Sequence, residues 1–321
     1  MPKINIFCKA SVVEGLGHLF RQIHIASELR KQNVDIVFYI PRFPTAENIL
    51  KKYNFSQKII DRFEQPLITN MGKTDATILD IQDTPSSLIK FLKKQSCKIV
   101  SFEDQGEGRN LVDLLIDCNL NSDDSKNIPQ KVKTLFGLSY SVLGPNFETQ
   151  HTKKRDFSDK IESLLLTFGG TDPHNITLDL AKQVPNNIKT TIILGAGFKN
   201  ENGLQKFDSI QIEKNVQDMA SMLVNHDAVF CSGGVTLHEA MCVGTPAFVI
   251  SQAPHQEDKA KMAEKAGAAI NLGQAKSWDE NRLPEIFKLG RKNLHDMSMA
   301  GKNCINGKGL KKVVKAILAI C

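Results

Sequence analysis

The chain has 321 residues, too many for one ordinary hydrophobic core and suited to two α/β domains of about 150 residues each. Its composition, 41% hydrophobic and 24% charged, is that of a soluble globular protein and argues against a largely disordered chain. The formal net charge of +6 is spread along the chain, and its basic residues are not interleaved with aromatic ones. This pattern favours anionic small molecules as partners and argues against nucleic acid.

Cysteine usage and the absence of long apolar segments indicate the compartment. No CxxC pair occurs, so we expect buried thiols in a reducing environment at Cys8, Cys97, Cys118, Cys231, Cys242, Cys304 and Cys321. Residues 1–7 lack the apolar core of a signal peptide, and no apolar stretch reaches the roughly 20 residues that span a bilayer. We therefore expect a cytoplasmic protein without stable membrane insertion.

The first half of the chain alternates apolar runs with helical patterns. A loop with Gly15 and Gly17 joins the first predicted strand to an amphipathic helix, as in a βα unit. The predicted strands of this half span 4–7, 34–40, 76–79, 98–102 and 111–116. Residues 119–160 are polar and irregular, which predicts a linker and a division into domains of residues 1–150 and 151–321.

The second half repeats the alternation. Its predicted strands span 163–167, 190–194, 210–212, 228–231 and 247–250. Its predicted helices span 176–183, 217–224, 236–242 and 257–266, followed by two terminal helices. Such βα repetition predicts an α/β fold of two Rossmann-like domains whose parallel sheets are covered by helices on both faces. Ligands of such sheets bind at the carboxyl ends of the strands, so the loops after the strands are the candidate sites.

The loop Gly15-Leu16-Gly17-His18 follows the first strand and opens the first helix. Its glycines let the backbone approach a ligand closely, and a helix amino terminus favours the neutral imidazole that a general base requires. Alternatively, His18 caps its own helix. The loop lacks the third glycine of a dinucleotide fingerprint, and no acidic residue follows the second strand to bind a ribose, which argues against a dinucleotide.

Two further loops follow strands of the second half. Gly169, Gly170 and Thr171 form either part of a ligand site or a plain glycine turn before a capped helix.

The stretch from Ser232 to Thr236 joins a strand to a helix, and its backbone N–H groups and two hydroxyls suit a diphosphate. One turn on, Glu239 could accept both hydroxyls of a ribose, or could be an ordinary solvated helix residue. Residues 251–256, with His255 and Gln256, form another polar loop suited to sugar hydroxyls.

Other site chemistries lack support in the sequence. The eight histidines show no HxH or HxxxH pair and the carboxylates no repeated Asp motif, so no metal site is predicted. The GxSxG motif of a Ser-His-Asp hydrolase is also missing.

The order of the motifs resembles a known family. GxGH follows the first strand, LLTFGGTDPHN opens the second half, and SGGVTLHEAMCVGTP precedes HQE. This order resembles the UDP-sugar hydrolases of pseudaminic acid synthesis and is similar to their spore-coat polysaccharide relatives, over most of the chain. The resemblance implies the GT-B fold of nucleotide-sugar glycosyltransferases, with nucleotide held mainly by the second domain and catalysis at the interdomain cleft.

The resemblance also implies roles for particular residues. His18 would activate the attacking water, and Gly233, Gly234 and Glu239 would hold the nucleotide of a UDP-sugar. We expect no cofactor, because the helix terminus and backbone donors can stabilise the diphosphate in place of a metal. Where the hydrolases have a tyrosine after the strand at 76–79, this chain has Gln82, and their Asn-Gln pair is replaced by His255-Gln256. Together with the loops, the resemblance predicts a substrate site formed by Gly15, Gly17, Gln82, Gly169, Gly170, Thr171, Ser232, Gly233, Gly234, Thr236, Glu239, His255 and Gln256.

Three functions remain open at this point. The first is hydrolysis of a UDP-activated amino or deoxy sugar at its anomeric C–O bond, supplying nonulosonic-acid or surface polysaccharide synthesis. The second replaces water by a sugar hydroxyl, giving an inverting glycosyltransferase. The third is a non-catalytic binder of nucleotide sugars.

Overall fold

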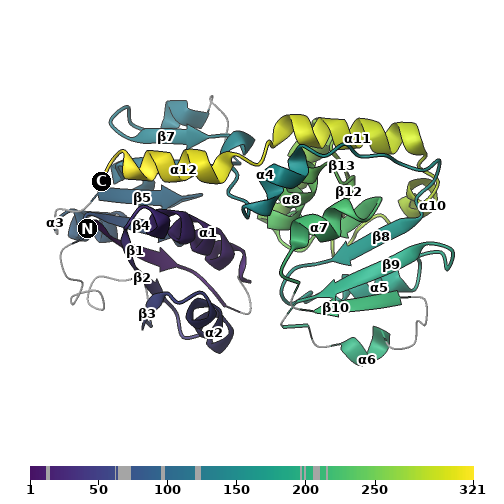
Figure 1. Ribbon diagram of the computed structural model, residues 1–321, viewed down its shortest axis with the longest axis horizontal. Coiled ribbons are helices and arrows are strands. Elements are labelled where there is room, and N and C mark those ends of the chain that lie inside the picture. Colours follow the sequence, from purple (N-terminus) through teal and green to yellow (C-terminus); the bar gives the residue numbers. More distant parts are fainter. Residues whose placement is uncertain are drawn as a thin grey trace. The chain divides into compact units, whose positions relative to one another are not determined.

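The computed structural model describes residues 1–11, 15–61, 63, 74–94, 98–119, 124–195, 197–198, 200–204, 210–214 and 216–321. The chain forms two compact units, the first comprising Met1–Gly144 with Lys308–Cys321 and the second Pro145–Gly307. Each unit is built around a parallel β-sheet with helices packed against it (Figure 1), which confirms the predicted α/β class.

The first unit contains a seven-stranded sheet in the order β3-β2-β1-β4-β5-β6-β7, and every neighbouring pair is parallel. Its strands are β1 (Lys3–Cys8), β2 (Asp35–Ile40), β3 (Ser56–Ile59), β4 (Ala76–Asp80), β5 (Lys98–Phe102), β6 (Leu114–Asp117) and β7 (Lys133–Phe136). Its α-helices are α1 (Gly17–Lys31), α2 (Pro44–Lys52), α3 (Ser86–Lys94) and α12 (Gly309–Leu318), with short 3-10 helices at Glu107–Leu111, Asp124–Asn127 and Leu138–Tyr140.

Both faces of this sheet are buried, which explains why its central strands are apolar at nearly every position. On one face, side chains of β1 such as Ile4 and Ile6 share a core with α1, α2 and α12. On the other face, Phe7 shares a second core with Leu88 and Leu92 of α3. The side-chain alternation of each strand thus serves two hydrophobic layers.

The second unit contains a six-stranded sheet in the order β10-β9-β8-β11-β12-β13, again all parallel. Its strands are β8 (Ser163–Thr167), β9 (Lys189–Leu194), β10 (Ile210–Lys214), β11 (Ala228–Cys231), β12 (Ala247–Ser251) and β13 (Ala269–Gln274). Its helices are α4 (Asn146–His151), α5 (Ile176–Ala181), α6 (Glu201–Leu204), α7 (Met219–Val224), α8 (Val235–Val243), α9 (Pro254–Lys265), α10 (Leu283–Ile286) and α11 (Arg291–Cys304), with a 3-10 turn at Glu280–Arg282.

Each sheet has one position where the strand order reverses. The first sheet grows outward from β1 to β3 and then resumes at β4 on the other side of β1; the second grows from β8 to β10 and resumes at β11 beside β8. At such a reversal the loops after the two central strands diverge, and ligands of open parallel sheets bind there. The loops singled out in the sequence follow β1 and β4 in one unit, and β8 and β11 in the other.

The C-terminal helix corrects the predicted domain division. The terminal helices were assigned to the second domain, but Lys308–Cys321 belongs to the first unit. Helix α12 packs beside α1 (Figure 1), and its apolar residues Leu310, Val313 and Ile317 are buried in the first core. The prediction assigned α12 to the second domain because it follows that domain in sequence. Its apolar face instead packs into a core with residues almost 300 positions away, such as Leu19.

The predicted linker is also wrong in part. Within residues 119–160 the chain forms β7 and α4, and it passes from one unit to the other between Gly144 and Pro145. Strand β7 was missed because it is an edge strand whose side chains are exposed or half-buried, so it lacks an apolar run. Strand β6 begins at Leu114, later than predicted, because a 3-10 helix occupies the residues up to Leu111.

The cysteines agree only in part with the expectation of burial. Cys8, Cys118, Cys231 and Cys242 are buried free thiols, whereas Cys304 is half-buried and Cys321 is exposed, against the expectation of burial. Cys97 lies outside the described residues. No helix in the described part of the chain is both long and apolar enough to cross a membrane.

Candidate active site

The first-unit site is centred on Asp80, the last residue of β4. Its carboxylate is fully buried and accepts from three residues at the start of α1. Oδ1 lies 2.6 Å from His18 Nδ1 and 2.7 Å from Arg21 Nη2, and Oδ2 accepts from Arg21 Nε at 3.0 Å and from Gln22 Nε2 at 2.7 Å. Residues at spacings of three and four lie on one face of a helix, so α1 directs all three side chains at one carboxylate.

Charge keeps Asp80 ionised in spite of its burial. Burial alone would raise its pKa, but Arg21 and His18 outweigh that effect and lower the pKa to about 2. The pKa of Arg21 is affected in the same way: burial would lower it, but the charges of Asp80 and Glu103 raise it well above its ordinary value. The carboxylate and the guanidinium are therefore both charged throughout the physiological range.

The geometry selects one tautomer of His18. An ionised carboxylate has no proton to donate, so in the short bond to Asp80 the Nδ1 of His18 is the donor. The lone pair of the neutral ring is then on Nε2, and the side chain is 19% exposed. The alternative that His18 caps its own helix is not supported, because within the described residues no side-chain capping bond occurs at the start of α1. A histidine oriented by a buried aspartate is suited to general-base chemistry.

The loops after β4 and β5 are tied together beside this site. Asp104 is fully buried, and its Oδ1 accepts from the backbone N–H groups of Thr84 at 3.0 Å and Gly106 at 2.9 Å. The backbone N–H of Gln105 donates to the carbonyl of Gln82 at 2.8 Å. Gln82 is half-buried and has a left-handed φ of 70°.

In the second unit, Asp172 connects the loop after β8 with the loop after β12. Its carboxylate accepts from the first backbone N–H groups of α5, those of Ile176 and Thr177, and from Gln252 Nε2 at 3.3 Å. Gln252 also donates to the carbonyl of Phe168 at 3.0 Å. The capping role in this loop therefore belongs to Asp172, and Gly169, Gly170 and Thr171 lie ahead of it at the end of the strand, Gly169 with a φ of 79°.

The glycine loop after β11 contacts the start of α9. Gly233 is buried, and a Cβ at this position would lie 2.2 Å from the carbonyl oxygen of Gln256. Gly234 precedes α8, whose first turn has no acidic residue and, among the described residues, no side-chain cap. The first N–H groups of a helix have no intrahelical acceptor and attract anions, so a diphosphate site at this turn stays a prediction.

Neighbouring side chains differ from the prediction in two respects. His255 and Gln256 are in the first turn of α9 rather than in a loop, because Pro254 begins the helix two residues before Gln256. His255 is exposed, and Gln256 Oε1 accepts from the backbone N–H of Gln252 at 2.9 Å. The Thr236 hydroxyl was expected to donate to phosphate. In this structure it instead hydrogen-bonds to Glu239.

Glu239 is half-buried on α8, which is not the position of an ordinary solvated residue. Burial raises its pKa to about 7, although the hydrogen bond from Thr236 acts in the opposite direction. Such a carboxyl group is poised to bind hydroxyl donors, which would compensate the desolvated charge.

The raised pKa of Glu239 predicts a pH-dependent stability. Between its ordinary pKa of 4.5 and about 7 the folded protein binds more protons than the unfolded chain, so stability falls as pH rises through this window. We expect Glu239→Gln to increase the melting temperature relative to wild type at pH 8 and to have little effect at pH 4.5. Thermal unfolding at both pH values measures this, with exposed Glu285→Gln as the control. An equal shift at both pH values would contradict the assignment.

The structure brings together more residues than the sequence predicted. In the first unit, His18 was predicted, but Asp80, Arg21, Gln22 and Glu103 were not assigned roles. The spacing of residues 18, 21 and 22 and a charged residue ending an apolar strand were the available signals. Gly15 and Gly17 are placed at the entry to α1, where Gly15 has a φ of 74°.

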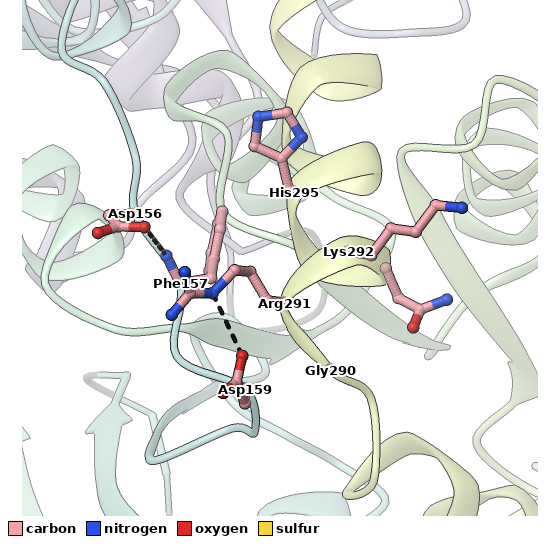
Figure 2. Close-up of a pocket in the computed structure, with 8 residues that line it drawn as sticks. Asp156, Phe157, Asp159, Gly290, Arg291, Lys292 and His295 are labelled. Carbon is pink, nitrogen blue, oxygen red and sulfur yellow. Dashed lines mark hydrogen bonds and ion pairs between the residues drawn. The ribbon is translucent and has the colours of Figure 1, made fainter.

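A separate pocket of about 590 Å³ in the second unit is lined by none of the predicted site residues. It is formed by the segment before β8 and the start of α11 (Figure 2). Its Arg291 pairs with Asp159 at 3.3 Å, and both side chains are largely exposed. No cluster of three potential metal-ligating side chains occurs here or elsewhere among the described residues.

Comparisons with known proteins agree with this architecture. The chain is 26% identical to the spore coat polysaccharide biosynthesis protein SpsG of Bacillus subtilis over 336 residues, covering 97% of this chain and 96% of that protein. It is 23% identical over 273 residues to the UDP-2,4-diacetamido-2,4,6-trideoxy-beta-L-altropyranose hydrolase of Campylobacter jejuni, covering 80% of this chain and 94% of that protein. MurG of Acinetobacter baumannii superposes with a TM-score of 0.68 at 16% identity, covering 99% and 100% of the two chains. No family model matches the chain.

The two Rossmann-like units, each with its polar loops at the strand-order reversal, define a protein of the GT-B fold. Within that class, the chain is similar over most of its length to the spore-coat protein SpsG and to the altropyranose hydrolase. The resemblance inferred from the motifs is therefore confirmed.

Proposed function

We propose that this protein hydrolyses a UDP-activated amino or deoxy sugar at the anomeric C–O bond, with inversion of configuration. The single observation that carries the proposal is the His18–Asp80 pair at the strand-order reversal of the first unit. The name of the Campylobacter jejuni relative, a hydrolase of a UDP-linked diacetamido-trideoxy sugar, supports the choice of substrate class. The released sugar would supply a nonulosonic acid or a surface polysaccharide.

In the proposed reaction, His18 acts as the general base. Asp80 accepts a hydrogen bond from Nδ1–H, so Nε2 takes a proton from water while the water oxygen attacks the anomeric carbon. The bond from that carbon to the diphosphate oxygen breaks, and its electron pair leaves with UDP. His18 then releases its proton to solvent, and the free sugar has the opposite anomeric configuration.

The second unit would hold the nucleotide. The uncapped start of α8 and the backbone N–H groups of Gly233 and Gly234 suit the diphosphate, whose charge increases as the bond breaks. Glu239 would accept the ribose hydroxyls. Gly169, Gly170 and Thr171 are at the carboxyl end of the neighbouring strand and complete this set of loops.

The test is to incubate the pure protein with a panel of UDP- and CMP-sugars, including diacetamido-trideoxyhexoses, without any acceptor. Proton NMR would follow nucleotide release and the anomeric configuration of the product. We expect UDP and free sugar of inverted configuration from at least one UDP-sugar. Binding of a UDP-sugar without release would contradict hydrolysis.

An inverting glycosyltransferase is the second candidate. Two positions differ from the hydrolase pattern: Gln82 replaces a tyrosine, and His255 replaces an asparagine. These differences allow a sugar hydroxyl to replace water, and His18 would be the base in the same way. UDP release that begins only when a sugar acceptor is added would identify this reaction, whereas binding with no release under either condition would indicate a non-catalytic binder.

A further inference from the structure

Arg21 is held between two carboxylates, those of Asp80 and Glu103, in a more constrained arrangement than a surface ion pair. Its guanidinium makes a two-pronged bond to Asp80, with Nε on Oδ2 and Nη2 on Oδ1, while Nη1 lies 2.7 Å from Glu103 Oε1. The Arg21 side chain is 10% exposed, and its guanidinium lies 5.5 Å from the centre of the Phe102 ring. A planar fork held on three sides has little freedom to adopt another arrangement.

Arg21 also lies close to the catalytic histidine. Its Nη2 is 3.2 Å from His18 Nδ1, and both nitrogens share Asp80 Oδ1. Two hydrogen-bonding patterns are chemically consistent with this crowding. In one, Asp80 is ionised and Nδ1 donates to it; in the other, Asp80 carries a proton and donates it to Nδ1, which moves the ring hydrogen to Nε2.

Only the first pattern leaves Nε2 able to accept a proton from water. The positive charge of Arg21 favours it, because a fully buried aspartate without a cation would be driven toward its neutral form. Gln22 stabilises the same carboxylate through Oδ2 but carries no charge. The choice between a competent and an incompetent base thus depends on Arg21.

Glu103 has a complementary effect. Without it, protonation of His18 would leave two positive groups beside one carboxylate; with it, the cluster of His18, Arg21, Asp80 and Glu103 is neutral when the histidine is charged. Glu103 occupies this place with a left-handed φ of 46°, a conformation that costs a non-glycine residue energy and concentrates at functional sites. The thiol of Cys118 donates to Glu103 Oε1 at 3.1 Å and so adds no charge.

We propose that Arg21 is a positioning residue that maintains the Nδ1–H tautomer of His18 through Asp80, and that Glu103 balances its charge when the histidine is protonated. This inference rests on the proposed function for its catalytic consequence, but the tautomer itself is measurable without substrate.

The experiment uses the full chain labelled with 15N-histidine, and the ring-nitrogen shifts of His18 are assigned by comparison with His18→Gln. We expect the Nδ1–H pattern in wild type and in Arg21→Lys, which retains the charge, and a shift to the Nε2–H pattern in Arg21→Gln, which removes it. Arg30→Gln is the matched control, because Arg30 is on the same helix and binds the carbonyls of Tyr53 and Asn54. Circular dichroism verifies that each variant is folded.

Activity supplies the second readout. We expect Arg21→Gln to lower kcat by about 10²-fold with a much smaller change in KM, and Glu103→Gln to lower kcat while retaining the Nδ1–H tautomer. A folded Arg21→Gln variant with an unchanged Nδ1–H pattern would overturn the proposal. If that variant does not fold, loss of the Nδ1–H pattern in Arg21→Lys would overturn the role assigned to charge. Absence of hydrolysis in wild type with the expected tautomers would instead refute only the proposed function.

Discussion

Replacing His18 by alanine is expected to lower kcat for UDP release by about 10²–10⁴-fold, the usual contribution of a general base. The reason is that water would then have no acceptor for its proton at the end of β1, whereas nucleotide binding by the second unit would be unaffected. The measurement is the initial rate of UDP release, together with the affinity for UDP from calorimetry. We expect the affinity to change by less than about twofold.

The matched control is His295→Ala, which removes an exposed histidine of the second unit. Its activity should equal that of wild type. If His18→Ala retained full activity on the true substrate, His18 would not be the base and the catalytic assignment of the first unit would fail.

Replacing Gly233 by alanine is expected to destabilise the protein by about 1–3 kcal/mol and to weaken UDP binding by more than about tenfold. The added Cβ would lie 2.2 Å from the carbonyl oxygen and 2.9 Å from the carbonyl carbon of Gln256. These are backbone atoms at the start of α9, so the clash can be relieved only by moving the glycine loop or the helix. Urea unfolding and calorimetric titration with UDP measure the two effects.

The neighbouring glycine provides the control. A Cβ at Gly234 would meet Ser232 Oγ at 3.7 Å and Gln256 Nε2 at 3.9 Å, which are ordinary contacts. Gly234→Ala should therefore have wild-type stability within about 0.5 kcal/mol. Equal unfolding free energies for the two variants would show that the close approach at Gly233 has no energetic consequence.

The most predictable part of the molecule was its pattern of buried strands. Parallel strands covered on both faces are apolar throughout, so β1, β4, β5, β8, β11 and β12 were evident within one or two residues. The edge strands β3, β7 and β13 were not, because most of their side chains are exposed or half-buried and their residues are mixed. Where an edge strand forms and where a helix ends depend on residues that are close in space but distant in sequence. Local sequence patterns do not reveal these contacts.

The candidate site divides in the same way. His18 and the glycine loops could be predicted because each lies in a short motif directly after a strand. Asp80 and Glu103 could not be given roles. They are 59 and 82 positions from Arg21, and the sequence does not indicate that they contact its guanidinium. The resemblance to the hydrolase family indicated the fold and the glycine loops that we propose hold the nucleotide, but not this cluster.

By itself, the sequence determined the α/β class, the positions of the strand-end loops and the motif order that relates the chain to SpsG-like proteins, because backbone periodicity and glycine placement are local properties. Only the tertiary structure decided which unit contains α12, which residues surround Asp80, and which nitrogen of His18 faces that carboxylate. These features depend on contacts between distant segments and on the charge of a buried carboxylate, whose energy depends on everything packed around it.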